Sequence, residues 1–178
     1  MTSAEVLLIG GRAGVGKTTV AWEVSALLRR AAVSHAIIDG DFLGQVHPAP
    51  DDDPDRSEIT ERNLAAVWAN FAQRGYHRLV YTNTACVLPS EAGLFVRALG
   101  TDVRATRVLL TATDATARER LTRRELGSEL AQELAGSAHK ARVLDAGVCP
   151  ETIRIPTDGR SVSAIAEEVL SATGWTCG

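Results

Sequence analysis

Residues 6–19 read Val6-Leu7-Leu8-Ile9-Gly10-Gly11-Arg12-Ala13-Gly14-Val15-Gly16-Lys17-Thr18-Thr19. The four apolar residues predict a strand, the glycines predict a turn, and the residues after Lys17 have the composition of a helix start. Within this segment, Gly11-x-x-x-x-Gly16-Lys17-Thr18 matches the phosphate-binding loop pattern at every specified position. The alternative is a plain glycine turn with an exposed lysine, but such a turn does not need a Lys-Thr pair at that offset. The segment therefore predicts a nucleotide phosphate site.

The spacing of this loop follows from the chemistry of binding a polyphosphate. Consecutive backbone N–H groups must point inward, which requires backbone angles open mainly to glycine, and the following helix directs its free N–H groups to the same phosphates. Lys17 is placed to reach the β and γ phosphates, and the Thr18 hydroxyl is placed to ligate Mg²⁺. ATP and Mg²⁺ are the expected cofactors. The expected nucleotide-binding residues of the loop are Gly11, Arg12, Ala13, Gly14, Val15, Gly16, Lys17, Thr18 and Thr19.

Composition limits the class of protein. The 178 residues suit one domain spanning 1–178, and 45% hydrophobic and 23% charged residues are typical of a globular chain. The net charge of -3 argues against nucleic-acid binding through a broad basic face. No apolar run approaches a membrane span, and residues 1–5 lack the basic region of a signal peptide, so we expect a cytoplasmic protein. Three scattered cysteines suggest neither a disulfide framework nor a zinc site.

Strands are expected to alternate with helices along the whole chain. This order predicts an α/β fold of three layers, with about five parallel strands covered by helices on both faces. We expect Ser57 to cap the second long helix, and the proline- and acid-rich 43–57 segment to be an exposed excursion. After residues 6–10, the expected strands are 34–39, 78–84, 104–112 and 152–155, and the expected helices are 17–30, 57–75, 89–99, a stretch from 114 to about 144, and 161–170.

Two aspartates follow the second expected strand, in Ile38-Asp39-Gly40-Asp41. The carboxyl ends of parallel strands are where ligands bind in open α/β sheets, and residues two apart on a strand point the same way. A guanine-nucleotide switch is disfavoured because no Asn-Lys-x-Asp motif occurs late in the chain. A motor-type ATPase is disfavoured because the third strand ends in Tyr81-Thr82-Asn83-Thr84, without an acid.

The chain resembles the small P-loop kinases that phosphorylate hydroxyl-bearing metabolites, such as the gluconate, shikimate and adenylylsulfate kinases and the chloramphenicol phosphotransferases. The resemblance rests on the loop at 11–18, the Asp39-Gly40-Asp41 edge and the arginine-bearing stretch 119–124. It implies the P-loop NTPase fold with strand order 2-3-1-4-5 along the sheet, and a short helical lid over approximately residues 118–140. The lid lacks the subfamily signatures of gluconate and shikimate kinases, so the resemblance assigns neither substrate.

The resemblance also implies roles for single residues. Arg120 would lie on the adenine face and Arg124 would reach the phosphates, although Arg120 and Arg124 can also belong to a solvated helix in which Glu119 pairs with Arg123. The loop carrying Asp158 and Gly159 would contact adenine through backbone groups.

The phosphoryl-transfer reaction suggests roles for the two aspartates at the strand edge. By family analogy these two roles differ. Asp39 would lie nearer Mg²⁺, with Thr18 as the second metal ligand, and Asp41 would be the base and substrate anchor, without a firm separation of the two. The alternative is that they form a strand-to-turn cap of the Asp-Gly kind. The expected catalytic residues are thus Lys17, Asp39, Asp41 and Arg124.

The acceptor is expected between Asp41, residues 42–62 and residues 81–84. Asp51, Asp52 and Asp53 could favour an amine-bearing substrate, but a solvated loop is the preferred interpretation. We expect an ATP- and Mg²⁺-dependent phosphotransferase acting on a hydroxyl group of a small molecule, a monomer or homodimer that binds neither nucleic acid nor membrane. One alternative is a nucleotide or nucleoside kinase, suggested by Arg56 and Arg62. The other is an ATP-binding regulatory protein without a small-molecule acceptor.

Overall fold

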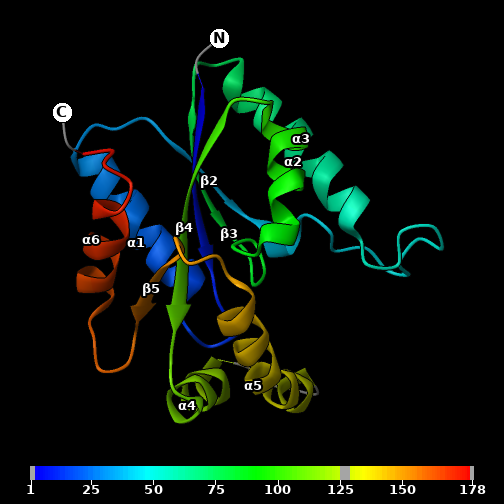
Figure 1. Ribbon diagram of the computed structural model, residues 1–178, viewed down its shortest axis with the longest axis vertical. Helices are drawn as coiled ribbons and strands as arrows, with labels where there is room; N and C mark the ends of the chain where they lie inside the picture. Colours follow the sequence, from blue (N-terminus) through cyan, green and yellow to red (C-terminus); the bar gives the residue numbers. More distant parts are fainter. Residues whose placement is uncertain (1–2, 125–128, 177–178) are drawn as a thin grey trace.

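The computed structural model describes residues 3–124 and 129–176, and in this part of the chain five strands form one parallel sheet (Figure 1). The order along the sheet is β2-β3-β1-β4-β5, as the sequence predicts. Every neighbouring pair is parallel, with Leu7 opposite Val80 of β3 and Thr106 of β4. The strands are β1 (Ala4–Gly10), β2 (Ala36–Asp39), β3 (Arg78–Thr82), β4 (Val103–Thr111) and β5 (Ile153–Pro156).

Helices cover both faces of the sheet, which confirms the expected three-layer α/β fold. On one face lie α1 (Lys17–Arg30) and α6 (Val162–Ser171), and on the other α2 (Ser57–Ala72) and α3 (Ala92–Leu99) (Figure 1). Strand β1 is buried on both sides because its side chains alternate between two cores: Val6 and Leu8 pack toward α2 and α3, and Leu7 and Ile9 pack toward α1 and α6. The phosphate-loop segment therefore leaves the most buried strand of the molecule.

Two further helices lie near the carboxyl edge of β4, namely α4 (Asp114–Arg124) and α5 (Glu129–Gly147) (Figure 1). The end of α5 returns to the sheet, where Leu144 and Val148 join the core beneath α3. Residues 118–140, expected as a lid, run from the second half of α4 into α5. Residues 125–128 of that stretch, and the side chain of Arg124, lie outside the described part of the structure. None of the helices described is both long and apolar enough to cross a membrane.

The N-terminus of α2 differs from the expectation. Ser57 does not cap the helix: the N-cap is Arg56, at φ 58°, without a side-chain cap bond. Instead the buried carboxylate of Asp53 accepts hydrogen bonds from Glu58 N (3.2 Å) and Ile59 N (3.0 Å). These bonds, that of Ile59 above all, hold the pKa of Asp53 below its usual value. The solvated-loop interpretation is therefore wrong for Asp53, although Asp51 and Asp52 are exposed.

Candidate functional site

The phosphate loop joins β1 to α1 in the conformation that its glycines predict. Gly11, Gly14 and Gly16 all have positive φ, of 143°, 86° and 95°. At Gly14 space also matters, because a Cβ there would lie 2.6 Å from the carbonyl oxygen of Ala117 in α4. The loop is thus packed against α4 as well as bent, and both features exclude larger residues. Lys17 and Thr18 are the first two residues of α1, at the end where helix N–H groups are free.

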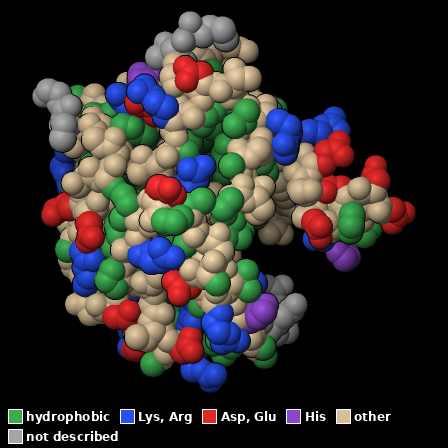
Figure 2. All heavy atoms as spheres, in the orientation of Figure 1, with side chains coloured by type: hydrophobic (Ala, Val, Ile, Leu, Met, Phe, Trp, Pro, Cys, Tyr) green, Lys and Arg blue, Asp and Glu red, His purple; other side chains and the backbone are tan. Residues whose placement is uncertain are grey.

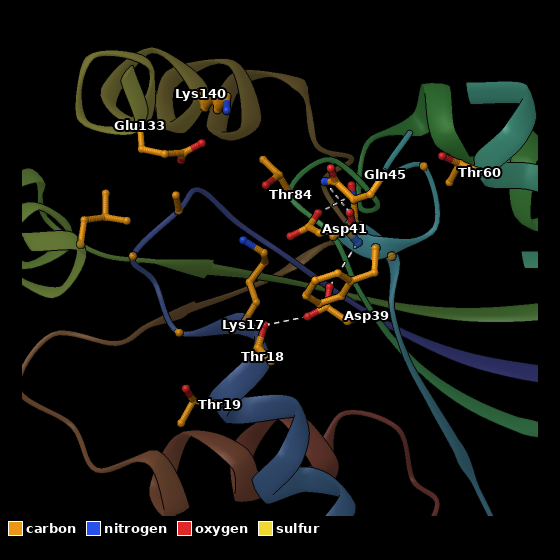
Figure 3. Close-up of a pocket in the computed structure, with 18 of the residues that line it drawn as sticks. Lys17, Thr18, Thr19, Asp39, Asp41, Gln45, Thr60, Thr84, Glu133 and Lys140 are labelled. Carbon is orange, nitrogen blue, oxygen red and sulfur yellow. Dashed lines mark hydrogen bonds between the residues drawn. The ribbon is translucent and has the colours of Figure 1, made fainter. Parts of the chain in front are cut away.

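Asp39 connects this loop to the next strand. Its Oδ2 accepts a hydrogen bond from Thr18 Oγ1 at 2.9 Å, and its Oδ1 accepts one from the backbone N–H of Asp41 at 3.2 Å (Figure 3). The second bond caps η1, a short 3-10 helix over Gly40–Phe42. The two interpretations of Asp39 are therefore compatible, since one carboxylate both caps the turn and faces the loop threonine.

The Thr18–Asp39 pair suits Mg²⁺. Both atoms are oxygens, which this ion prefers, and Mg²⁺ is usually held by one or two protein groups together with phosphate oxygens and water. Among the described residues, no group of three or more His, Cys, Asp or Glu side chains could hold a metal ion. A metal at Thr18 and Asp39 would thus depend on ligands from a bound nucleotide.

Asp41 is oriented by a residue from the neighbouring strand. Asn83 Nδ2 donates to Asp41 Oδ1 at 2.7 Å, and Asn83 Oδ1 in turn accepts from Ala85 N at 2.9 Å. The residue as a whole is exposed, but its carboxylate is partly enclosed, and this desolvation raises the pKa of Asp41. The nearby charge of Lys17 acts against the rise, and that of Asp39 adds to it. Asp41 thus has the environment of a carboxylate that can take up a proton.

The turn between the two aspartates is fixed from below by Tyr81. A Cβ at Gly40 would lie 2.0 Å from the Tyr81 hydroxyl, so no residue larger than glycine fits at this position. Tyr81 is itself buried, with its ring edge-on to Phe95 at a centroid distance of 5.1 Å. Burial raises the pKa of Tyr81, which therefore remains a neutral packing group at ordinary pH. The turn that carries Asp39 and Asp41 thus packs directly on the core.

Cys86 supports Asn83 from the core side. Its Sγ lies 3.3 Å from the carbonyl oxygen of Asn83, to which it donates. Burial raises the pKa of the Cys86 thiol to about 12, so the group stays protonated and has no place in the chemistry of the site.

These groups open into one cavity of about 670 Å³, here called the main cavity. Figure 2 shows the surface indented between the protruding 43–57 segment and the block of α4 and α5. Figure 3 shows Lys140 and Glu133 of α5 across the cavity from Lys17 and Asp41. The sequence-predicted residues that line it are Ala13, Gly14, Gly16, Lys17, Thr18, Thr19, Asp39, Asp41 and Arg120.

Two polar residues of the main cavity, Glu133 and Lys140, were not expected as site residues, whereas Gln45 and Thr60 lie within the 42–62 segment that was expected to bound the acceptor. A signal existed for Lys140. Of the 19 lysine and arginine residues of the chain, all but Lys17 and Lys140 are arginine. Both of these lysines line the main cavity. Glu133 has no comparable mark in the sequence.

Arg120 links three segments near the phosphate loop. Its guanidinium donates to Thr157 Oγ1 (2.9 Å), to the carbonyl oxygen of Thr157 (3.0 Å) and, at 3.4 Å, to that of Val15. The alternative Glu119–Arg123 ion pair is also present, at 2.6 Å on the exposed face of α4. Since Arg120 and Arg123 point to different partners, the pair does not compete with the position of Arg120.

Other predicted residues lie outside the lining of the main cavity. The buried Arg12 side chain turns away from the loop and forms an ion pair with Asp114 at the start of α4. The Asp158 carboxylate accepts from Thr113 N (3.1 Å) and Thr113 Oγ1 (2.8 Å). Hydroxyls of Thr116 and Thr113 lower the pKa of Asp158 to about 2. Gly11, Val15 and Gly159 are also absent from the lining.

Comparisons with known proteins agree with this geometry. A family model described as AAA domain matches residues 6–145. A gluconokinase from Sinorhizobium meliloti 1021 has a TM-score of 0.63 and 17% identity, covering 98% of this chain and 94% of its own. The tunicamycin resistance protein of Deinococcus radiodurans has a TM-score of 0.61 and 17% identity, covering 96% of each chain.

The APS kinase of Mycobacterium tuberculosis, in complex with AMPPNP and APS, has a TM-score of 0.57 and 20% identity, covering 97% of this chain and 98% of its own. No curated protein matches the sequence. At these identities the likeness concerns the fold, and at that level the predicted resemblance to small P-loop kinases is confirmed.

Proposed function

The chain belongs to the AAA domain family, and from this premise we propose that it is a phosphotransferase that moves the terminal phosphate of ATP, with Mg²⁺, to a hydroxyl group of a small molecule. One observation carries the proposal: the loop residues Lys17 and Thr18 and the strand-edge residues Asp39 and Asp41 line the same main cavity. A nucleotide-binding protein without an acceptor needs the loop alone, whereas a transferase also needs a group that receives the acceptor proton. The structural likeness to proteins described as kinases supports the same reaction class.

Each residue has a part that follows from its position. Lys17 would neutralise charge on the transferred phosphate, and the loop amides would hold the phosphates in place. Thr18 and Asp39 would hold Mg²⁺, which when bound supplies positive charge to the phosphate oxygens. The side-chain amide of Asn83 already donates a hydrogen bond to Asp41 Oδ1. Asp41 Oδ2 is then the oxygen that accepts the proton of the acceptor hydroxyl.

The acceptor would occupy the end of the main cavity beyond Asp41. The described walls there come from the 43–57 segment, from Thr60 of α2 and from α5, and they carry both charges: Asp55 and Glu133 against Arg56 and Lys140. Such a polar lining suits a hydroxylated metabolite or antibiotic with further polar groups.

A nucleotide or nucleoside kinase is the second candidate, favoured by Arg56. Its Nε donates to the carbonyl oxygen of Val46 (3.1 Å), which holds the guanidinium at the cavity wall, where a phosphate on the acceptor could meet it. Arg62, the other arginine that suggested this function, is exposed, approaches Glu58 at 3.6 Å and is absent from the lining.

ADP release measured with and without a panel of acceptors separates the candidates. The panel contains hydroxylated metabolites, nucleosides, nucleoside monophosphates and hydroxyl-bearing antibiotics, each with ATP and Mg²⁺. A small-molecule kinase is expected to release ADP at least tenfold faster with one acceptor class than without it. Release that no acceptor changes would favour the ATP-binding regulatory protein, and calorimetry without heat on adding Mg²⁺–AMPPNP would contradict nucleotide binding altogether.

A further inference from the structure

A second cavity, here called the β4–α5 cavity, lies between the end of β4, the edge strand β5 and the second half of α5. Its volume is about 440 Å³, within the range of small-molecule sites. It shares no lining residue with the main cavity in the described part of the chain. Apolar residues form much of its lining, including Leu109 of β4, Ala112 just after that strand, and Ala141 and Leu144 of α5. An apolar body can therefore lie against this wall.

Three arginines line the same cavity: Arg12, Arg142 and Arg154. Arg154 is already engaged, because its Nε donates to Asp145 Oδ1 at 3.2 Å. Arg12 is 4% exposed and pairs with Asp114 through Nη1, yet its Nε is buried and has no hydrogen-bond partner among the described residues. A buried donor without an acceptor is costly, by roughly 1–3 kcal/mol, so the protein itself does not fully satisfy the Arg12 guanidinium.

Arg142 is the second arginine of this cavity whose guanidinium is available to a ligand. Among the side chains that the structure describes, none forms a hydrogen bond or ion pair with its guanidinium, and Arg142 lines the cavity on the α5 side. Its charge also acts on Asp114, the partner of Arg12, and this places Arg142 and Arg12 in one electrostatic neighbourhood. Two guanidinium groups with donors to spare, beside an apolar wall, form a site with one charged and one apolar part.

We propose that the β4–α5 cavity binds a small carboxylic acid with an apolar body, its carboxylate at Arg12 and Arg142 and its hydrocarbon part against Leu109 and Ala141. A carboxylate matches the planar donor pair of a guanidinium. The apolar wall contributes to the free energy of binding only when the ligand buries hydrocarbon surface against it. A bare inorganic anion would leave that wall empty. Arg12 belongs to the phosphate loop, but the β4–α5 cavity shares no described lining residue with the main cavity, so the proposal does not depend on the function proposed above.

The test is a titration of the ¹⁵N-labelled full chain with cyclohexanecarboxylate, followed by ¹H–¹⁵N correlation spectra. Saturable shifts are expected at the amides of Ala112 and Ala141, with a Kd on the order of 1 mM or below. The neutral analogue cyclohexanecarboxamide is expected to bind about tenfold more weakly, because it lacks the charge. Saturating Mg²⁺–AMPPNP should leave the shifts in place.

Three variants locate the site. Ala141→Trp fills the cavity and should abolish the saturable shifts. Arg142→Gln keeps the surface polar and should weaken binding about fivefold. Arg123→Gln, which removes an arginine from the exposed face of α4, is the matched control and should bind like the unaltered chain.

The proposal fails on any of four results. They are absence of saturation at about 20 mM probe, equal binding of the carboxamide, displacement by AMPPNP, which would assign the carboxylate to the phosphate loop, or unchanged binding in Arg142→Gln. Since Arg142 is exposed, that variant remains informative even if Ala141→Trp does not fold.

Discussion

The two ends of the main cavity are built in different ways. At the phosphate end, Gly14, Gly16, Lys17 and Thr18 come from one continuous stretch between the almost fully buried strand β1 and the first turn of a helix. At the acceptor end, the wall is assembled from the 43–57 segment, Thr60, Asn83 with Thr84, and Glu133 with Lys140. Backbone geometry defines the first end, and side chains on separate elements define the second.

This difference separates the recognition of the polyphosphate, which is general, from the recognition of the acceptor, which is specific to this chain. Backbone amides and a helix N-terminus recognise any polyphosphate, so their arrangement needs no information about the acceptor. Side chains on separate segments can change one at a time without disturbing the loop. Mutations at the phosphate end should thus alter nucleotide use, and those at the acceptor end should alter acceptor use alone.

Asp41→Asn should give the largest effect. It removes the proton acceptor while keeping the shape and the bond partner Asn83, so turnover should fall by about 10²–10⁴-fold. Calorimetry should find Mg²⁺–AMPPNP affinity within about twofold of the unaltered chain, because Asp41 lies beyond the phosphate loop. Product formation at the original rate would show that another group takes the proton.

Lys17→Met should give the second largest effect, because it removes a positive charge at the phosphate end of the main cavity. Loss of one preorganised positive charge should lower turnover by about 10²–10³-fold, together with nucleotide affinity. Steady-state rates and AMPPNP calorimetry measure both. The matched control is Lys140→Met, the same substitution at the other end of the cavity, which should leave nucleotide affinity unchanged.

Asn83→Ala should lower turnover about tenfold, because Asp41 loses its orienting bond. The more specific readout is the pH–rate profile. Burial already raises the pKa of Asp41, and the Asn83 bond counteracts this. Without that bond the pKa rises further, so the acid limb of the profile should move to higher pH. A lower rate with an unmoved acid limb would mean that Asn83 is only structural.

Lys140→Met should itself change acceptor use by a smaller amount. Removing one exposed cation from the acceptor wall should raise the acceptor KM about threefold to fivefold, with kcat nearly constant, if the acceptor carries an anionic group. Initial rates at varied acceptor concentration measure this split. A drop in kcat without a change in KM would place Lys140 at the phosphates instead.

Asp53→Asn should affect stability and not chemistry. Because the folded-state pKa of Asp53 lies below the ordinary value of 3.8, its ionised form stabilises the fold above that value, and the effect is lost as pH falls through the lowered pKa. The midpoint temperature of thermal unfolding at pH 7 should therefore be about 2–4 °C lower in the variant than in the unaltered chain. This difference should shrink below pH 4. Asp52→Asn, at an exposed neighbour, should change nothing at either pH.

Local features of the fold and site could be predicted from the sequence. The strand before Gly11, the helix from Lys17 to Arg30, and the Asp39–Asp41 pair each depend on neighbouring residues, whose periodicity and spacing the sequence displays directly. The sheet order also agrees, because the family resemblance supplied it.

Features that join distant residues could not be predicted. Arg12 lies inside the loop motif, yet its side chain pairs with Asp114, 102 positions away. The cap of α2 is supplied by Asp53 and not by the adjacent Ser57, because the preceding turn brings the earlier carboxylate back to the helix end. The acceptor wall has the same character, since Glu133 and Lys140 approach Asp41 only through the packing of α5.

The distribution of lysine has a practical use in labelling chemistry. Apart from the terminal amine, Lys17 and Lys140 are the only primary amines of the chain, and both face the main cavity. Lys17 is 9% exposed whereas Lys140 is exposed, so of the two lysines an acylating reagent should modify Lys140 first. A fluorophore or crosslinker attached through that amine would sit at the mouth of the cavity, without any engineered cysteine, and would report directly on what enters it.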